Sequence, residues 1–281
     1  MKRPKFLRPS NIRGTIFLVI ALVIGIIFAL PFIYMISTSL KGQSELFTRP
    51  ATFFPTKGYY FQAYLDVWSK GKFDQYFMNS VVVSSASTLV SVVIAILAGL
   101  GFARYKLPNK LLLSILVSQL FPLVLLVPPF FVVFRQMGLY DTHAALIISY
   151  VSFALPYSVW MLTGYFRSIP IDLEEAAQVD GATRLGAYLR ITLPLATPGI
   201  AATIVYCFIL AWNEFLFAFT FISNPSLRTL PVGLQMFIGQ YGVEWNLLMA
   251  GAVVTTIPVV VLFVILQRYL VAGLTAGAVK G

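Results

Sequence analysis

The sequence of 281 residues contains few charged residues, one histidine and one cysteine. Charged residues make up 11% of the chain, whereas a soluble domain has roughly 25%. Hydrophobic residues make up 59%, and the mean hydropathy is +0.86. This composition excludes an ordinary soluble domain and predicts an integral membrane protein.

The scarcity of reactive side chains excludes several kinds of site. His143 alone cannot form a multi-histidine metal centre, and Cys207 alone cannot form a disulfide within the chain. Cys207 lies in an apolar run, which is typical of a small buried side chain. The chain also lacks a G-x-x-x-x-G-K-[ST] phosphate-binding loop. We therefore expect no catalytic residue, no metal and no cofactor here, and an intramembrane enzyme is disfavoured.

Long apolar runs are what the sequence does have. A membrane-spanning helix needs about 20 apolar residues, and a helix satisfies its own backbone hydrogen bonds within the bilayer. Six segments meet this length: residues 14–36, 79–103, 111–134, 144–166, 197–222 and 248–270. The predicted fold is an all-α integral membrane protein with six transmembrane helices over residues 14–270, flanked by tails at 1–13 and 271–281.

The basic residues predict the orientation of these helices. The net charge of +10 comes from Lys and Arg in short loops beside apolar runs, which indicates membrane topology and no nucleic-acid partner. With a cytoplasmic N-terminus, 13 Lys and Arg fall inside and 7 fall outside, five of the latter in the long aromatic-rich loop 37–76. Both termini are therefore predicted to be cytoplasmic, in a multi-pass protein of the cell (inner or plasma) membrane that contacts lipid.

The second predicted span has a face of small residues that recur every four positions. They are Ser87, Ser91, Ala95, Gly99 and Ala103. Small residues allow close approach of helix backbones in lipid, where apolar burial gives no driving force between helices. The pattern predicts a tight helix contact, either within the subunit or with a partner. Another segment, residues 223–247, is too apolar for a free loop and is expected either to pack against the protein or to enter a cavity.

Residues 168–194 form a polar segment between the fourth and fifth spans. The segment holds four of the ten acidic residues: Asp172, Glu174, Glu175 and Asp180. We expect a helix capped by Asp172, with Glu175 in capping-box position, then a turn at Gly181 and a second short helix. With the adjacent Arg167, the segment has three Arg against its four carboxylates. A lipid-surface helix favours an excess of Lys and Arg, so a protein partner with basic groups fits better.

The sequence E-A-A, followed after three residues by Gly and after nine more by I-x-L-P, resembles the EAA loop of ABC importer permeases of the sugar branch. The sequence A-W-N-E-F at 211–215 is similar to the smaller permease of maltose-type systems, and the resemblance extends over most of residues 14–270. Tyr188 stands where many relatives have Phe. The resemblance implies a type I importer permease fold, with cytoplasmic coupling helices in the loop 168–194 (the coupling loop).

This resemblance also implies partners. An ABC ATPase homodimer would dock on the coupling loop and bind ATP and Mg, a second, unlike permease would complete the pore, and an extracytoplasmic solute-binding protein would deliver the solute. Glu175 would pair with a basic group of the ATPase. The residues that the resemblance assigns to ATPase docking are Glu174, Glu175, Ala176, Ala177, Asp180, Gly181, Ala182, Leu193 and Pro194.

Glu214 is an ionisable residue inside the predicted fifth span. A charged side chain at the centre of a membrane helix costs about 2.5–3.5 kcal/mol on insertion scales, so Glu214 should face a cavity or a polar partner. With Trp212 and Asn213 it has the chemistry to bind a sugar in the substrate path, but a structural polar cluster is an equal interpretation. The alternatives for the whole chain are an ABC permease for a non-sugar solute, or a proton-coupled secondary transporter that uses Glu214.

Overall fold

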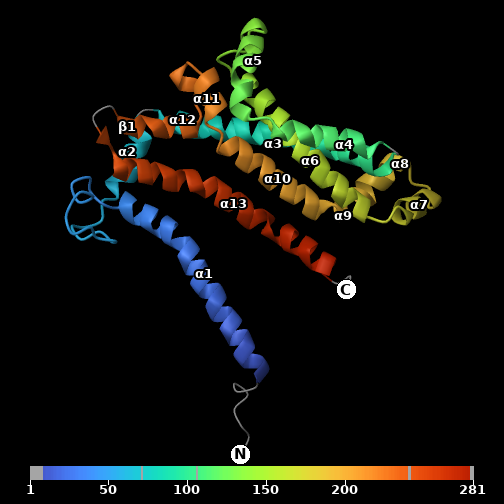
Figure 1. Ribbon diagram of the computed structural model, residues 1–281, viewed down its shortest axis with the longest axis horizontal. Coiled ribbons are helices and arrows are strands. Elements are labelled where there is room, and N and C mark those ends of the chain that lie inside the picture. Colours follow the sequence, from blue (N-terminus) through green and yellow to red (C-terminus); the bar gives the residue numbers. More distant parts are fainter. Residues whose placement is uncertain (1–8, 71, 106, 240–241, 279–281) are drawn as a thin grey trace, which may run out of the picture. The chain divides into compact units, whose positions relative to one another are not determined.

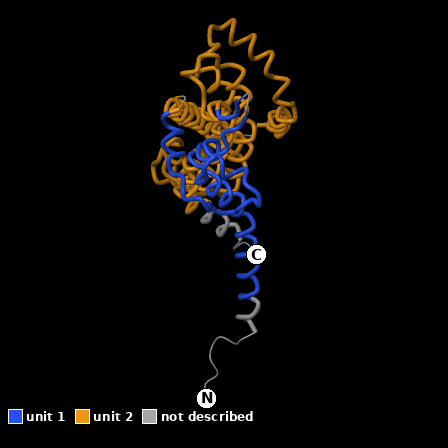
Figure 2. Tube along the Cα trace, turned by 90° about the vertical axis from the view of Figure 1, so that its left-hand side faces the viewer, with its two compact units in different colours: residues 1–69, 237–254 blue, residues 70–236, 255–281 orange. Residues whose placement is uncertain are grey.

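The computed structural model describes residues 9–70, 72–105, 107–239 and 242–278, with side chains from residue 14 to residue 270 (Figure 1). The chain forms two compact units, which Figure 2 distinguishes by colour. Unit 1 contains residues 1–69 and 237–254, and unit 2 contains residues 70–236 and 255–281. The coupling loop and the segment around Glu214 both belong to unit 2.

Unit 1 is built on the long apolar helix α1, Pro9–Ser39, whose side chains from Ile16 to Phe32 are mostly exposed. It also contains α2 (Gln62–Ser69) and the antiparallel strands β1 (Ile238–Gly239) and β2 (Gly242–Val243). Glu45 fixes the connection between α1 and α2, because its Oε1 accepts hydrogen bonds from Thr56 N (2.6 Å) and Thr56 Oγ1 (2.8 Å).

Unit 2 is almost entirely helical. Its elements are α3 (Phe73–Arg104), α4 (Asn109–Val117), η2 (Ser118–Leu120), α5 (Leu123–Gln136), α6 (His143–Ser168), α7 (Asp172–Val179), α8 (Arg184–Ala187), the π turn η3 (Tyr188–Thr192), α9 (Leu193–Leu195), α10 (Thr197–Trp212), α11 (Leu216–Phe221), η4 (Pro225–Leu227) and α12 (Leu230–Leu234). Two further elements have residues in both units: η5 (Gln235–Phe237) and α13 (Trp245–Ala278).

The core of unit 2 is the packing of α3 against α6 and α10, which run side by side in Figure 1. The small-residue face of α3 makes this contact possible. Ser87, Ser91, Ala95 and Gly99 are buried, and a side chain at Gly99 would come within 3.2 Å of Leu162 Cβ on α6. The predicted tight contact is thus made within the subunit.

Among the described residues, four helices are long and apolar enough to cross a membrane, and the number rises to six if each of two bent helix pairs is one span. The four correspond to the predicted first, second, fourth and sixth spans. Helix α1 begins at Pro9 and α13 continues to Ala278, so parts of the predicted tails are helical. The remaining parts of those tails, residues 1–8 and 279–281, lie outside the described residues.

The predicted third span, 111–134, consists of two helices separated by a sharp bend. Helices α4 and α5 meet at an angle of 94°, with the break at Phe121–Pro122. Phe121 is extended, as residues before proline tend to be, and Pro122 occupies the N-cap of α5. Figure 1 shows α5 rising away from α4.

The predicted fifth span, 197–222, is also interrupted. Helix α10 ends at Trp212 and α11 starts at Leu216, so Glu214 lies in a break between two helices and not within one. At its other end α10 follows the helical segment Arg184–Leu195 at an angle of 72°. The predicted packing of segment 223–247 is confirmed for α12, because Leu230 and Val232 of this helix are buried. Residues 240–241 of the segment lie outside the described part.

Candidate functional site

The coupling loop turns back on itself at a glycine. Helix α7 ends at Asp180, and Gly181 adopts φ +91°, a left-handed conformation that glycine reaches without steric cost. The amide of Gly181 donates to Gln178 O (3.0 Å) and that of Ala182 donates to Ala177 O (2.9 Å), which satisfies carbonyls at the helix end. The predicted helix–glycine turn–helix is confirmed.

The predicted cap of α7 is wrong. Ile171 occupies the N-cap position, Asp172 is the first helical residue, and no side chain caps the helix. Asp172, Glu174 and Glu175 all lie in the first turn, where negative charge is favourable because the helix dipole is positive there. The next helix, α8, does have a side-chain cap, since Thr183 Oγ1 accepts from Gly186 N at 3.1 Å.

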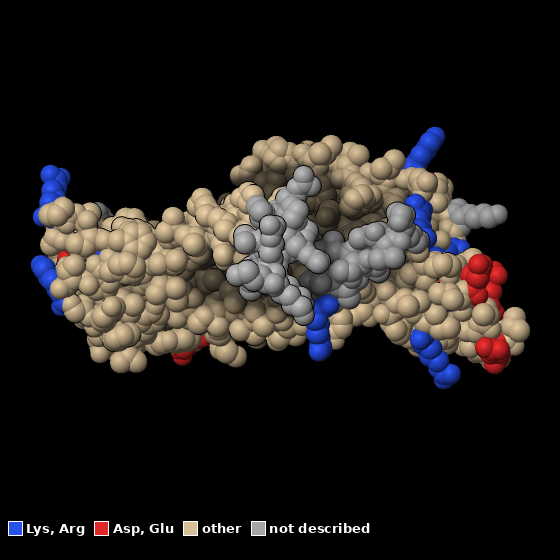
Figure 3. Space-filling view, turned by 90° about the horizontal axis from the view of Figure 1, so that it is seen from below, with Lys and Arg blue, Asp and Glu red and all other residues tan. Residues whose placement is uncertain are grey.

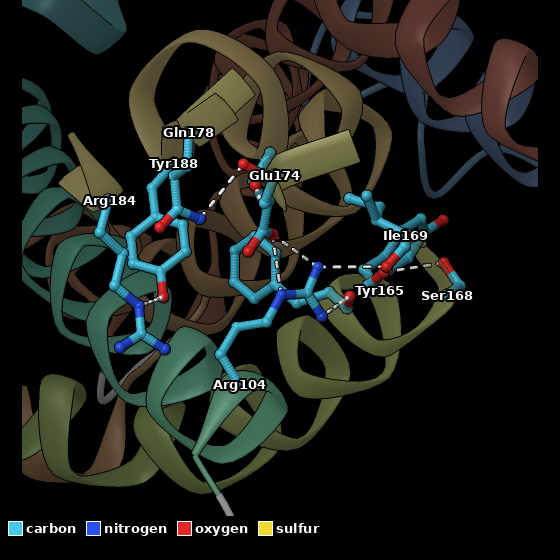
Figure 4. Close-up of polar contacts among 10 residues, drawn as sticks. Arg104, Tyr165, Ser168, Ile169, Glu174, Gln178, Arg184 and Tyr188 are labelled. Carbon is cyan, nitrogen blue, oxygen red and sulfur yellow. Dashed lines mark hydrogen bonds and ion pairs between the residues drawn. The ribbon is translucent and has the colours of Figure 1, made fainter. Parts of the chain in front are cut away.

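The inner side of the coupling loop is fixed by a buried ion pair. Arg104, the last residue of α3, donates from Nε to Glu174 Oε1 at 2.8 Å, and its Nη2 lies 2.8 Å from the same oxygen. Each side chain is 4% exposed. Arg104 also donates to the carbonyls of Phe166 (2.8 Å) and Ile169 (3.1 Å) at the end of α6 (Figure 4). One guanidinium therefore joins α3, α6 and α7.

A fourth element joins the same carboxylate. Thr192, the last residue of the π turn η3, donates from Oγ1 to Glu174 Oε1 at 2.6 Å, and Thr192 is fully buried. Glu174 itself is 3% exposed, so its carboxylate lies on the buried, inner side of the loop. A buried charge is costly unless it is paired and hydrogen-bonded, and here both conditions are met.

The outer side of the loop has a different composition. Of the residues expected to dock a partner, five are exposed: Glu175, Ala176, Asp180, Gly181 and Pro194. Ala177, Ala182 and Leu193 are half-buried. Large apolar side chains lie among them, with Val179 88% exposed, Leu185 64% and Leu189 55%. Figure 3 shows acidic side chains gathered at the end of the molecule that carries α7.

An exposed apolar surface surrounded by charge is typical of a protein–protein contact. Arg184 contributes a positive charge beside it. Its Nε donates to Tyr188 Oη at 2.9 Å, and its guanidinium lies 4.7 Å from the ring centre of Tyr105. The hydrogen bond to Tyr188 raises the pKa of Arg184 above its ordinary value. The outer side thus presents acidic, apolar and basic groups together.

The three residues proposed for a substrate path do not share one environment. Trp212 is 1% exposed, its indole N–H donates to Thr255 O at 3.1 Å, and its ring stacks on Phe208 at 5.4 Å. Asn213 is exposed and donates to Ile209 O. Trp212 therefore has the contacts of a core residue, and Asn213 is the exposed member of the three.

Glu214 is held by partners within the chain. Its Oε2 accepts from Tyr150 Oη at 2.7 Å and from Ala218 N at 3.1 Å, and its Oε1 accepts from Phe217 N at 2.9 Å. The two amides belong to the first turn of α11, so the carboxylate satisfies helix donors that have no intrahelical acceptor. This geometry is that of a helix cap tied to α6.

Sequence reasoning missed three residues of these networks: Arg104, Thr192 and Tyr150. No spacing relates them to their partners, because Arg104 is 70 residues from Glu174 and Tyr150 is 64 from Glu214. Arg104 could have been suspected from its position, because it ends a span whose face of small residues predicts close packing with another helix. No cluster of His, Cys, Asp or Glu suited to a metal occurs among the described residues.

Residues 91–276 match the family described as binding-protein-dependent transport system inner membrane component. The sulfoquinovosyl glycerol transport system permease protein of Agrobacterium fabrum is 41% identical over 256 residues, which cover 89% of this chain and 88% of that protein. The trehalose/maltose transport system permease protein of Thermococcus litoralis is 36% identical over 280 residues, or 98% of this chain and 100% of that protein.

A solved structure with a similar fold is a bacterial ABC transporter involved in the import of alginate. The TM-score is 0.75, with 22% identity, and the match covers 95% of this chain and 99% of that one. This likeness supports the fold alone. The family match spans most of the chain and includes the coupling loop. It agrees with the apolar helices found on both sides of that loop. The chain belongs to the family of inner membrane components of binding-protein-dependent transport systems.

Proposed function

We propose that this chain is one of two unlike permease subunits of an ABC importer for a sugar, namely a di- or oligosaccharide. The names of the similar proteins support the solute class, since they include sulfoquinovosyl glycerol and trehalose/maltose systems. The proposed orientation has both termini and the coupling loop in the cytoplasm, as the distribution of Lys and Arg indicates. A solute-binding protein delivers the sugar on the other side of the membrane.

The observation that carries the proposal is the two-sided construction of the coupling loop. The outer side offers Glu175, Val179 and Leu185 to a partner, and we place the ATPase homodimer there, with its own ATP and Mg. The inner side is joined through Glu174 and Arg104 to α3 and α6. A movement imposed by the ATPase then passes to the spans, as alternating access by rigid-body rotation requires.

The secondary-transporter alternative is less well supported. A proton-carrying Glu214 has to exchange its proton with the solute path, but both of its oxygens accept hydrogen bonds from groups of this chain. That alternative also gives no role to the exposed apolar side chains of the coupling loop. Import of a non-sugar solute by the same architecture remains the second candidate, and uptake measurements distinguish the two.

The test is a mild-detergent purification of the tagged chain from its native membrane, followed by mass spectrometry. We expect an ATPase with a phosphate-binding loop and a second permease with its own EAA loop. Val179→Asp places a charge on the outer side and should reduce recovery of the ATPase but not of the second permease. Lys57→Asp, an exposed change in unit 1, is the matched control. Reproducible recovery of this chain alone would contradict the proposal.

A further inference from the structure

The exposed face of α6 differs in chemistry from the exposed faces of α3 and α13. In the middle of α3 the exposed side chains are mostly aliphatic, including Val82, Leu89 and Leu97, and on α13 they include Ile257 and Val264. Such faces suit lipid tails. Between positions 149 and 168 of α6, by contrast, no exposed side chain is aliphatic.

Apart from Arg167, the exposed residues of α6 in this range are aromatic, small or hydroxyl-bearing. Tyr157 and Trp160 are 37% and 45% exposed, and Gly164 and Ser168 follow at intervals of four. Residues three and four apart lie on one side of a helix, so these form one continuous face. A neighbouring helix adds to it, because the ring of Tyr206 on α10 lies 4.7 Å from that of Tyr157.

This aromatic cluster lies deep in the spans. Tyr157 is 11 residues from the end of α6 and Tyr206 is 9 from the start of α10. At the helical rise these separations correspond to about 16 Å and about 14 Å, near the middle of a hydrocarbon core of about 30 Å. Tyrosines of membrane proteins are usually enriched at the two interfaces, so this depth calls for a specific reason.

The polar atoms of the cluster are unsatisfied. In the part of the chain that the structure describes, neither Tyr157 Oη nor Tyr206 Oη has a hydrogen-bond partner, and the rings contact each other and Trp160. A hydroxyl group transferred to an apolar medium without a partner is costly. The hydroxyls therefore indicate that this face meets water or a polar solute.

The face continues into a cavity of about 420 Å³ at the end of α6. Trp160 belongs both to the aromatic cluster and to the wall of the cavity, which also includes Thr163, Gly164, Arg167 and Ser168. Aromatic faces and hydroxyl groups thus extend from mid-depth to the end of the helix that adjoins the coupling loop, although Leu112 and Met161 also belong to the cavity wall. These groups offer stacking surfaces and hydrogen bonds, the two interactions that a sugar ring can make.

We propose that Tyr157, Trp160 and Tyr206 line the solute path and bind the faces of the transported sugar as it passes. This inference rests on the proposed function for the solute class, and it moves the sugar contact of this subunit away from the buried Trp212. The aromatic side chains bind by stacking and the two tyrosine hydroxyls by hydrogen bonds. A companion permease or lipid covering the same face is the competing arrangement.

Cysteine labelling of the whole complex in native membrane vesicles tests it, since the single native Cys207 is 1% exposed. A charged methanethiosulfonate reacts with a thiolate in water, so Trp160→Cys should react about tenfold or more faster than Leu97→Cys on the aliphatic face of α3. Maltose, trehalose or sulfoquinovosyl glycerol should slow the labelling when the complex takes up that sugar, and methionine should not. The unsubstituted chain supplies the background rate.

Two outcomes would overturn the inference: labelling of Trp160→Cys as slow as that of Leu97→Cys, or fast labelling that a transported sugar does not slow. A complex that takes up none of the three sugars counts against the proposed function instead, and the labelling rate then decides whether the face lines a water-filled path. As a second measurement, Trp160→Leu should lower sugar uptake several-fold while Trp160→Phe retains most of it, with recovery of the ATPase unchanged in both.

Discussion

Two carboxylates of this chain, Glu174 and Glu214, are held in contrasting ways. Glu174 is buried against a cation, Arg104, and its further partner Thr192 comes from a different element. Glu214 is half-buried and accepts only from neutral donors, a tyrosine hydroxyl and two amides of the following helix. The Glu174 carboxylate joins segments that are distant in sequence, whereas the Glu214 carboxylate mainly caps the helix that follows it.

The contrast teaches that an acidic residue in a membrane protein does not by itself mark a contact with something outside the chain. Both residues were candidates for such a contact, and both direct their oxygens to partners within unit 2. The residue beside Glu174 shows the opposite behaviour, because Glu175 is exposed on the outer side of the same helical turn. The expected consequences of changing these residues differ accordingly in size.

The largest effect is expected from Arg104→Ala. This change leaves the Glu174 carboxylate buried without its cation, and breaking a buried pair by removing one partner costs about 3–5 kcal/mol. Hydrogen exchange of residues 168–194 should increase strongly, with loss of sugar-stimulated ATP hydrolysis by the complex. Arg190→Ala, an exposed change on the same loop, is the control and should have little effect.

The double variant Arg104→Met with Glu174→Leu sharpens this test. Replacement of a buried ion pair by apolar side chains of similar volume is often neutral for stability, so part of the protection from exchange should return. The rest stays lost, because the Phe166 and Ile169 carbonyls and the Thr192 hydroxyl have no partner in the double variant. Protection in Arg104→Ala equal to that of the unsubstituted chain would show that the pair does not hold the loop.

A smaller effect is expected from Glu214→Gln. The amide oxygen can take the place of Oε2 and still accept from Tyr150 and Ala218, but the NH2 group then faces the amide of Phe217. One unsatisfied buried donor costs about 1–3 kcal/mol. Exchange should increase at the start of α11 and not in the coupling loop. Tyr150→Phe removes the hydroxyl alone and should reproduce part of the change. Uptake that is driven by protons in the unsubstituted chain and abolished in Glu214→Gln would contradict the capping role.

Gly181 tests the outer side of the loop, because it is exposed and has no side-chain contact within the chain to lose. A residue with a β-carbon at φ +91° is strained by about 1–2 kcal/mol, and Asn and Asp tolerate such a conformation better than other residues. Nothing lies within 4 Å of a β-carbon at this position, so Gly181→Asn and Gly181→Asp share the same small backbone cost. The added charge of Gly181→Asp should weaken co-purification of the ATPase more than Gly181→Asn does; equal recovery argues against docking at this turn.

The smallest effect concerns a third carboxylate, Glu45, in the loop after α1. The amide of Thr56 is the main cause that holds the pKa of Glu45 below its ordinary value, and the Thr56 hydroxyl and Lys41 act in the same direction. A lowered pKa in the folded state gives stability that is present above the ordinary pKa of glutamate, about 4.3, and is lost as the pH falls through the folded value.

Hydrogen exchange of residues 40–60 should therefore be constant near neutral pH and increase, relative to the intrinsic rate, only in acid below the ordinary glutamate range. Glu45→Gln should remove this dependence. An acid transition of the same size in Glu45→Gln would assign it to another group.

The sequence was sufficient to predict the helical class, the small face of α3 and the glycine turn. Each follows from a local pattern: apolar length, a period of four, and a residue type that favours positive φ. The break at Pro122 was visible as a proline, but its angle of 94° was not, because a proline permits several bends and the surrounding packing selects one.

The direction of Glu174 could not be predicted for a different reason. Neighbouring positions 174 and 175 on a short helix are chemically identical, and only the packing of α3 and α6 decides which of them meets Arg104. The same limitation applies to Glu214. The apolar run in the sequence continues through the break and does not reveal it. The hydrogen bonds of Glu214 come from a side chain of one helix and from backbone amides of another.

The π turn at Tyr188–Thr192 has a consequence for the evolution of this loop. A π turn contains one residue more than an α-helical turn and is accommodated as a single-residue insertion. Each residue of an α-helix advances the side-chain direction by about 100°, so deletion of one residue here would rotate Thr192 away from Glu174 or shift everything that follows. Length in these five residues is therefore under tighter constraint than side-chain identity, and natural variation should accumulate as substitutions on the outer surface and not as gaps.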